Sequence, residues 1–468
     1  MKQNSKVYLF TNFNLPIKPN TYEKNDLSIN NVFNIQTSHS RIEPLMDFSD
    51  YFQKKLSKEE FQLFTEINNE IINDILCIAP YEFFEESNQE HTIRHFVITN
   101  NLILHELNTS SMKLVNLNIS FASLPKVYYN SEQLVLTDSK STFIVIDKNN
   151  PPYFVTSYPD IHKWCTFLDN TYVLFNNKKY SVYSCTNNNI FELSPNITDY
   201  EEIQLNSEFG HIEDIFEFEN YILIFQQYRI SKLTKTNSIH KISTTNFLTS
   251  QIYGKTIAKI NDYVVFLSSS GLYIFDGNDT KQIFAEITKD IAYGNFEAVV
   301  FNNKYYLKSE FYISGAKENV LFELDIEKNI CSIFKFDSKI ENLRVIKNSN
   351  DYLLCLTLVK DNQFKVVCLN NSKTNSLTKQ ITFNKIAFDT NNNKKLKSIQ
   401  VLGSGEFYVS LSSENNECNF HSFGNLSANN IGLQGQFFEF SITSDKAFII
   451  DAISFEIENI EDSLWLTK

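Results

Sequence analysis

The chain has 468 residues, with 42 Lys or Arg and 55 Asp or Glu, which gives a formal net charge of −13. Its 41 Phe and 23 Tyr, within 42% hydrophobic residues, can build a large core and exclude disorder as the main state. A chain this acidic, with four arginines (Arg41, Arg94, Arg229 and Arg344), lacks the basic surface for gripping nucleic acid or an anionic membrane.

The N-terminal part, residues 1–91, is predicted to be an arm with one amphipathic helix. Ser57 and Glu60 form a capping box that starts a helix of about residues 58–76. Apolar residues recur along it at helical spacing, at Phe61, Phe64, Ile67, Ile71, Ile72 and Ile75. The preceding residues resemble extended chain with short strands. We expect no secretory signal and no membrane-spanning helix, because no apolar run of suitable length occurs.

Seven cysteines occur, and no two form a C-x-x-C pair. Several lie in apolar, strand-like stretches, as Cys355 does. This pattern predicts reduced, buried thiols in a reducing compartment.

From about residue 92 the hydrophobic period becomes 2, and a strand–turn–strand unit repeats. Five of its seven second strands begin with Tyr, and turns rich in Asn and Asp precede them. Tyr221 and Tyr263, two of these leading tyrosines, are predicted to be core residues. The second strands are residues 101–104, 133–136, 172–175, 221–225, 263–266, 305–307 and 352–355.

Antiparallel four-stranded units of about 40–50 residues are typical of propeller blades, which bury both faces only when packed around an axis. We therefore predict a mainly β fold with a β-propeller of six or seven blades over residues 92–375. The alternative is a long meander of sandwiches with no closed ring.

The sequence pattern changes again near residue 375, and this change predicts a separate antiparallel β-sandwich over residues 376–468. Five of the eleven glycines lie between Gly403 and Gly435, and the strands become longer and alternate more strictly. Gly403-Ser404-Gly405 is predicted to be a turn between two strands. The predicted strands are residues 397–401, 406–411, 436–442 and 447–457.

The sequence contains no convincing set of catalytic or metal-binding residues. The eight His residues are scattered without a metal-ligand spacing, and no phosphate-binding, dinucleotide-binding or nucleophile-elbow motif occurs. His211 and Glu213 would share a face of a strand, but a loop before the strand is the favoured interpretation. Residues 276–279 resemble the start of a calcium loop, yet Ile287 occupies the position of the bidentate Glu, so a tight Asp-Gly hairpin turn is favoured.

The adjacent acids Glu201-Glu202 and Glu213-Asp214 are the candidate glycosidase pairs. Neighbouring residues on a strand point to opposite faces, so neither pair can act together simply. We therefore predict no catalytic, cofactor-binding or metal-binding residues, no cofactor, and no enzymatic activity.

Two segments resemble a known family. Residues 214–291, and above all the order of strands and turns from Asp262 to Ile291, resemble the tail hub (packaged-DNA stabilisation) and nozzle proteins of short-tailed bacteriophages. The segments IQVLGSGEFYVSLSSE and GLQGQFFEFSITSDKAFIIDAISFEIE look like the sandwich that closes many phage tail-tube and hub chains. The two resemblances cover about 140 residues, and residues 1–91 do not share them.

The resemblance implies a structural virion protein of the tail, assembled in the bacterial host cytoplasm. Such proteins form a homo-oligomeric ring, usually of six copies, below the portal and its adaptor. The ring continues the channel that retains and releases packaged DNA, with which contact is transient and non-specific. No membrane partner is implied. The alternatives are a cellular β-propeller that acts as a protein-interaction scaffold and a propeller hydrolase that acts on glycans.

Overall fold

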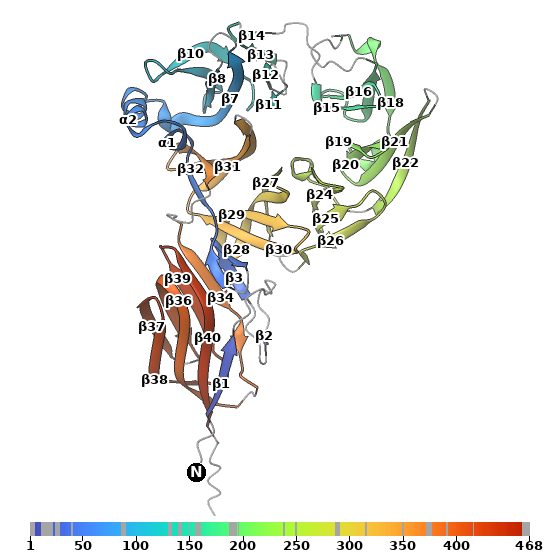
Figure 1. The fold of residues 1–468 in the computed structure, drawn as a ribbon. Coiled ribbons are helices and arrows are strands. Elements are labelled where there is room, and N and C mark those ends of the chain that lie inside the picture. Colours follow the sequence, from blue (N-terminus) through green and yellow to red (C-terminus); the bar gives the residue numbers. More distant parts are fainter. Residues whose placement is uncertain are drawn as a thin grey trace, which may run out of the picture.

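The computed structural model contains a seven-bladed β-propeller and a β-sandwich, which lie one above the other in Figure 1. It describes residues 5–460 except 11–21, 24–28, 39–40, 86–89, 130–132, 139–142, 149, 155–160, 187–193, 195, 237–238, 249, 286–290, 314–315, 349–350, 371–376, 390–391 and 415. The predicted mainly β propeller fold is confirmed, and the blade count is seven.

Each blade is a four-stranded antiparallel sheet whose first strand lies nearest the middle of the ring (Figure 1). Blade 1 is β7 (Ile75–Glu85), β8 (Glu90–Thr99), β9 (Ile103–Asn108) and β10 (Lys113–Ser120). Blade 2 is β11 (Lys126–Tyr129), β12 (Gln133–Thr137), β13 (Phe143–Asp147) and β14 (Tyr153–Phe154). Blade 3 is β15 (Ile161–Phe167), β16 (Asn170–Phe175), β17 (Ser181–Cys185) and β18 (Glu201–Gln204). Blade 4 is β19 (Ile212–Phe218), β20 (Tyr221–Gln226), β21 (Arg229–Thr236) and β22 (Ile239–Leu248).

The remaining blades complete the ring. Blade 5 is β23 (Ala258–Ile260), β24 (Tyr263–Ser268), β25 (Gly271–Phe275) and β26 (Thr280–Ile283). Blade 6 is β27 (Ile291–Phe301), β28 (Lys304–Ile313), β29 (Ala316–Asp325) and β30 (Ile330–Phe336). Blade 7 is β31 (Lys339–Asn348), β32 (Asp351–Lys360), β33 (Gln363–Asn370) and β6 (Asp47–Asp50). Short 3₁₀ turns connect some strands, namely η1 (Ile72–Asp74), η3 (Ile197–Asp199), η4 (Ser207–Phe209) and η5 (Gly254–Thr256).

The outermost strand of blade 7 comes from the N-terminal region. β6 pairs antiparallel with β33, with Phe48 opposite Leu369. Phe48 is buried, and its ring meets those of Phe334 and Phe336 edge-on at 5.2 and 5.6 Å between centroids. Pairing of β6 removes an exposed strand edge and joins the two ends of the propeller. The region predicted to be an arm therefore belongs to the propeller from residue 47 onward.

Blade 1 also begins before residue 92, because β7 and β8 precede or span that point. The prediction took residues 101–104 as a second strand, whereas Ile103 opens β9, the third strand of the blade. Three of the other predicted second strands open with the residue that starts β12, β20 or β24, and the rest begin just inside β16, β28 and β32. Because the first predicted strand is the third strand of its blade, the interval from residue 101 to residue 133 is shorter than the later intervals between predicted second strands.

The helical segment is shorter than predicted. α1 (Tyr51–Lys55) precedes α2 (Lys58–Ile67), and the capping box of Ser57 and Glu60 is present as predicted. α2 ends because the buried side chain of Asn68 donates to the carbonyl oxygens of Phe64 (2.8 Å) and Met112 (2.7 Å). These bonds attach the end of the helix to blade 1.

The sandwich contains strands from both ends of the chain, seen in Figure 1 as blue strands beside red ones. β1 and β5 pair with β40, and β3 pairs with β34. The propeller is thus inserted between two parts of the sandwich. Its strands are β1 (Ser5–Phe10), β3 (Ile29–Phe33), β4 (Ile35–Ser38), β5 (Arg41–Pro44), β34 (Lys379–Phe383), β36 (Lys394–Ser412), β37 (Glu417–Phe423), β38 (Leu426–Gly435), β39 (Glu439–Ser444) and β40 (Phe448–Asn459), and β2 (Tyr22–Glu23) pairs in parallel with β35 (Lys385–Ile386).

The predicted turn at Gly403-Ser404-Gly405 is wrong, because β36 runs through it. The first half of β36 pairs with β38 and its second half with β37 and β39, so the strand passes from one sheet to the other. The register shifts at Gly403, where a Cβ atom would lie 2.2 Å from the Ile449 carbonyl oxygen. Glycine therefore permits the bend without interrupting the strand.

Asn34 connects the sandwich with blade 6. It lies between β3 and β4, is buried, and has a φ of 58°, which Asn tolerates better than most residues. Its backbone N–H donates to the Ile333 carbonyl oxygen (2.7 Å), and its Oδ1 accepts from the Lys335 N–H (3.0 Å). Its side-chain amide donates to the Thr378 carbonyl oxygen (2.7 Å).

Cys355 and Cys368 form a disulfide, which corrects the prediction that all cysteines are reduced. The two residues face each other on β32 and β33, with 4.1 Å between their Cα atoms. The sequence pattern could not show this, because it does not specify the register between strands.

The leading tyrosines divide into two groups. Tyr221 is 9% exposed and donates to the Gly277 carbonyl oxygen (2.9 Å), as a core residue should. Tyr263 is 38% exposed, so its prediction as a core residue is wrong. The shared sequence position fixes where the strand starts but leaves the burial of each Tyr to the neighbouring blade.

Candidate functional site at the propeller axis

Irregular pairing in the innermost strands directs polar side chains toward the axis. In β7, β15, β19 and β31 the register shifts after the first or second residue, at Ile75, Ile161, Ile212 and Ile340, and β27 has a wider break. A β-bulge bends its strand and re-aims the side chains that follow. The residues directly after the breaks are Cys77, Lys163, Asp214, Glu297 and Asn342.

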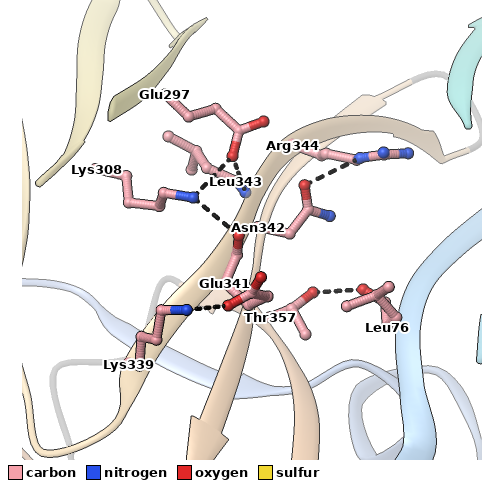
Figure 2. A network of polar contacts seen from close by, with 9 residues as sticks. All are labelled: Leu76, Glu297, Lys308, Lys339, Glu341, Asn342, Leu343, Arg344 and Thr357. Atoms are coloured by element: carbon pink, nitrogen blue, oxygen red, sulfur yellow. Dashed lines mark hydrogen bonds and ion pairs between the residues drawn. The ribbon is translucent and has the colours of Figure 1, made fainter. Parts of the chain in front are cut away.

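A buried ion pair within blade 6 is hydrogen-bonded to blade 7 (Figure 2). Lys308 is 4% exposed, and its Nζ lies 3.2 Å from Glu297 Oε2 and donates to the Glu341 carbonyl oxygen (2.8 Å). The same Glu297 oxygen accepts from the Leu343 N–H at 3.0 Å. One oxygen of Glu297 thus accepts from both blade 6 and blade 7.

Arg344 lies beside this network on β31, with its guanidinium extended past the Asn342 side chain (Figure 2). Its Nε donates to Asn342 Oδ1 (3.2 Å), and one terminal nitrogen lies 3.2 Å from Cys77 Sγ. Both partners are neutral, because burial raises the pKa of the Cys77 thiol despite the opposing effect of Arg344. Within the described part of the chain, Arg344 has no carboxylate partner.

Lys163 and Asp214 form the corresponding pair between blades 3 and 4, with 3.0 Å between Nζ and Oδ1. Burial raises the pKa of Asp214, while the charge of Lys163 and the hydrogen bond from the Ile215 N–H lower it. The pair is arranged to keep a buried carboxylate neutralised by its lysine.

Lys126, at the start of β11, is affected by charges from three other blades and from η5. Burial lowers its pKa from 10.5 to about 8, and the positive charge of Lys163 adds to that shift. Lys255 and Arg344 lower the pKa further, while Asp214 partly opposes them. Lys126 is nevertheless an exposed residue. Charged groups of blades 3, 4 and 7 and of η5 therefore act on Lys126 in blade 2.

We define the axial cluster as Lys126, Lys163, Asp214, Lys255, Glu297 and Arg344. Lys255 lies in η5, just before blade 5, and the others come from blades 2, 3, 4, 6 and 7. It contains four cations and two carboxylates, although the whole chain has a charge of −13. The sequence alone does not reveal this cluster, because its members are spread over more than 200 positions and share no motif. Only Lys126, Lys163 and Asp214 lie close to the start of a first strand.

The candidate residues from the sequence, apart from Asp214, are not members of the axial cluster and make contacts with nearby residues. His211 Nε2 lies 3.0 Å from Glu213 Oε1, and burial raises the pKa of Glu213. His211 precedes β19, as the loop interpretation predicted. Residues 276–279 form the predicted turn, since Asp276 Oδ1 accepts from the N–H groups of Asn278 and Asp279 (both 2.9 Å). Ile287 lies outside the described residues.

The acidic pairs do not converge on a common point. Glu201 accepts from His240 (2.9 Å), whereas Glu202 accepts from Ser181 (2.6 Å). Glu213 pairs with His211 and Asp214 with Lys163. Among the described residues no group of three or more His, Cys, Asp or Glu is placed to bind a metal ion.

A second surface feature lies on the sandwich. The rings of Tyr408 and His421 stack at 4.3 Å with 7° between their planes, and Phe423 contacts His421 at 4.6 Å. Phe423 is 76% exposed and Tyr408 is 48% exposed. We call these three residues the aromatic platform. Glu406 accepts from His421 (3.0 Å) at its edge, which fixes the imidazole ring.

Comparisons with known proteins find only distant structural similarity. No family model and no curated protein matches the sequence. The chain is similar to the solved structure of Hsv2 from a Kluyveromyces yeast (TM-score 0.32, 9% identity, 56% of this chain and 97% of that chain). It is also similar to BBS1N, solved with ARL6DN (0.37, 10%, 70% and 98%), and to YCF48, solved with a D1 peptide (0.38, 7%, 64% and 93%). No described helix is long and apolar enough to cross a membrane.

Proposed function

We propose that this protein is a non-enzymatic interaction scaffold, in which the propeller is the rigid body and the sandwich carries a partner-binding surface. The aromatic platform is the observation that carries the proposal. Stacked, exposed aromatic side chains are enriched at the centres of protein interfaces because they offer large contact area at low entropic cost. Asn34 supports it, since its bonds to blade 6 hold the sandwich in a defined orientation.

The test compares partner capture by three forms of the full chain. The double variant Tyr408→Ser/Phe423→Ser removes the exposed rings of the platform. The matched control is Tyr312→Ser, which removes a 47% exposed ring from blade 6. Cross-linking and mass spectrometry in cells of the source organism should recover the same partner with the native chain and the control, but not with the double variant. Equal recovery with all three forms would contradict the proposal.

A second candidate function is the ring-forming phage tail protein that the sequence resembles. The exposed apolar edge of β1 favours it, because the side chains of Val7 and Leu9 are 66% and 64% exposed. Within the described residues β1 pairs only with β40, so its outer edge could pair with a second copy. In this case the chain would be a virion component that contacts portal or adaptor proteins around the DNA exit channel.

Solution mass separates the two functions. Light scattering and negative-stain images of a monomer at micromolar concentration would favour the scaffold. A stable ring of identical subunits that Val7→Ser/Leu9→Ser dissociates would favour the tail protein. A ring that this variant leaves intact would show that β1 is not the contact.

A further inference from the structure

A small cavity lies at the border between blades 5 and 6, which are neighbours in Figure 1. Its volume is about 200 Å³. The hairpin turn between β24 and β25 lines it together with Gln282 of β26, Ile291 and Phe296 of β27, and Tyr253 from the segment before blade 5. The described residues that line it are all uncharged, and they offer apolar side chains, hydroxyls and one amide. Such a lining suits a neutral ligand, because an ion that leaves water needs a partner of opposite charge.

The hydroxyl groups near the turn form a connected network that fixes the polar side of the cavity. Ser268 is buried, and its Oγ lies 3.1 Å from Ser270 Oγ. Ser250 Oγ donates to Ser268 Oγ (2.9 Å) and accepts from Ser270 Oγ (2.8 Å). The Tyr273 hydroxyl extends the network, at 2.9 Å from Ser270 Oγ. A hydroxyl has one proton and two lone pairs, so hydroxyls that are bonded to each other still hold lone pairs for a ligand.

Two polar groups beside this network are free to bind a ligand hydroxyl. Ser269 Oγ accepts from the Gln251 N–H (3.2 Å), and within the described residues its own O–H donates to no other group. Gln282 Nε2 donates to the Ser270 carbonyl oxygen (3.1 Å), while its Oε1 accepts from no described residue. The cavity thus offers one donor and one acceptor, and a hydroxyl can use both. Side chains that are held in place before a ligand arrives lose little entropy when it binds.

An aromatic ring forms part of the apolar side of the cavity. The ring of the half-buried Tyr253 packs against that of Phe296, with 4.8 Å between centroids and 56° between planes. Phe296 is 6% exposed, so it supports the Tyr253 ring from the core. The Tyr253 N–H donates to the Leu267 carbonyl oxygen (3.0 Å), which holds the backbone beside the turn. The negative face of an aromatic ring attracts the C–H groups on the apolar face of a sugar ring.

We propose that this cavity binds one neutral pyranose sugar. The sugar hydroxyls both donate and accept, which matches Ser269 and Gln282, and the C–H face of the sugar lies against the Tyr253 ring. The volume is below the roughly 300–1,000 Å³ of sites for drug-sized ligands, so a single ring fits better than a chain of sugars. The proposal concerns binding without cleavage, and neither the scaffold nor the tail-protein function assigns a ligand to this cavity.

The direct test is saturation-transfer difference NMR of the full chain, titrated separately with glucose, galactose, mannose and N-acetylglucosamine. We expect saturable binding of at least one of these sugars, with the strongest transfer to the C–H protons of one ring face. Ser269→Ala and Gln282→Ala should each weaken binding about three- to tenfold, as the loss of one neutral hydrogen bond does. The matched control is Gln363→Ala, an exposed amide at the start of β33 in blade 7, which should bind as the native chain does.

Thermal melts distinguish loss of the site from misfolding of a variant. Ser269 and Gln282 are exposed, so both variants should melt at the native temperature. Absence of saturable binding of all four sugars would overturn the proposal, as would equal binding by the native chain and both cavity variants. Preference for N-acetylasparagine amide, a neutral peptide-like probe, over every sugar would overturn it as well.

Discussion

Closure of the propeller by β6 leads to a quantitative prediction for Phe48→Ala. A buried Phe removes roughly 150–250 Å² of apolar surface from water, worth about 4–6 kcal/mol at about 25 cal/mol per Å². Alanine still buries a small part of this apolar surface, and the surrounding core relaxes partly. We therefore expect a loss of about 3–5 kcal/mol in the free energy of unfolding. The substitution removes the edge-on packing of the Phe48 ring against Phe334 and Phe336.

Urea denaturation measures the total loss, and amide hydrogen exchange locates it. The N–H groups of β6 and β33 should exchange faster in Phe48→Ala, while those of the sandwich core should not change. Phe423→Ala is the matched control, because its ring is 76% exposed, and it should change stability by less than about 0.5 kcal/mol. A loss below about 1 kcal/mol for Phe48→Ala, with unchanged exchange in β33, would refute closure by β6.

Three further predictions concern buried groups. Burial lowers the pKa of His95 to about 4, below the ordinary 6.5, so the folded state favours neutral His95. This contribution to the free energy of unfolding should therefore be complete above pH 6.5 and fall by about 3 kcal/mol by pH 4. Urea titrations at several pH values measure it. The pH dependence should be reduced in His95→Gln and unchanged in His91→Gln, the control at an exposed site. Reduction of the Cys355–Cys368 disulfide, which closes a loop with a sequence separation of 13, should lower the urea midpoint by the equivalent of about 3 kcal/mol, and an unchanged midpoint would contradict this. Asn34→Ala should cost more than Asn34→Gly in thermal melts, since both lose the side-chain bonds but only Gly accepts the positive φ without strain; equal destabilisation would contradict this.

Local sequence features predicted local structure well. The capping box of Ser57 and Glu60 and the turn at residues 276–279 form because all the hydrogen-bonding partners lie within three residues. The two-residue period and the leading tyrosines likewise marked most second strands of the blades, since alternation reflects one strand lying between two packed faces. From these repeats the propeller fold followed, although the blade count did not.

Contacts between distant residues decided the rest. The edge at β33 is filled by β6 from more than 300 positions earlier, and Asn34 reaches Lys335 across a separation of 301. The sequence does not specify the register of such pairings. It therefore could not predict the disulfide between β32 and β33 or the strand that both sheets of the sandwich share. The axial cluster shows the same limit, because six charged residues become neighbours only when the ring closes and its first strands meet around one axis.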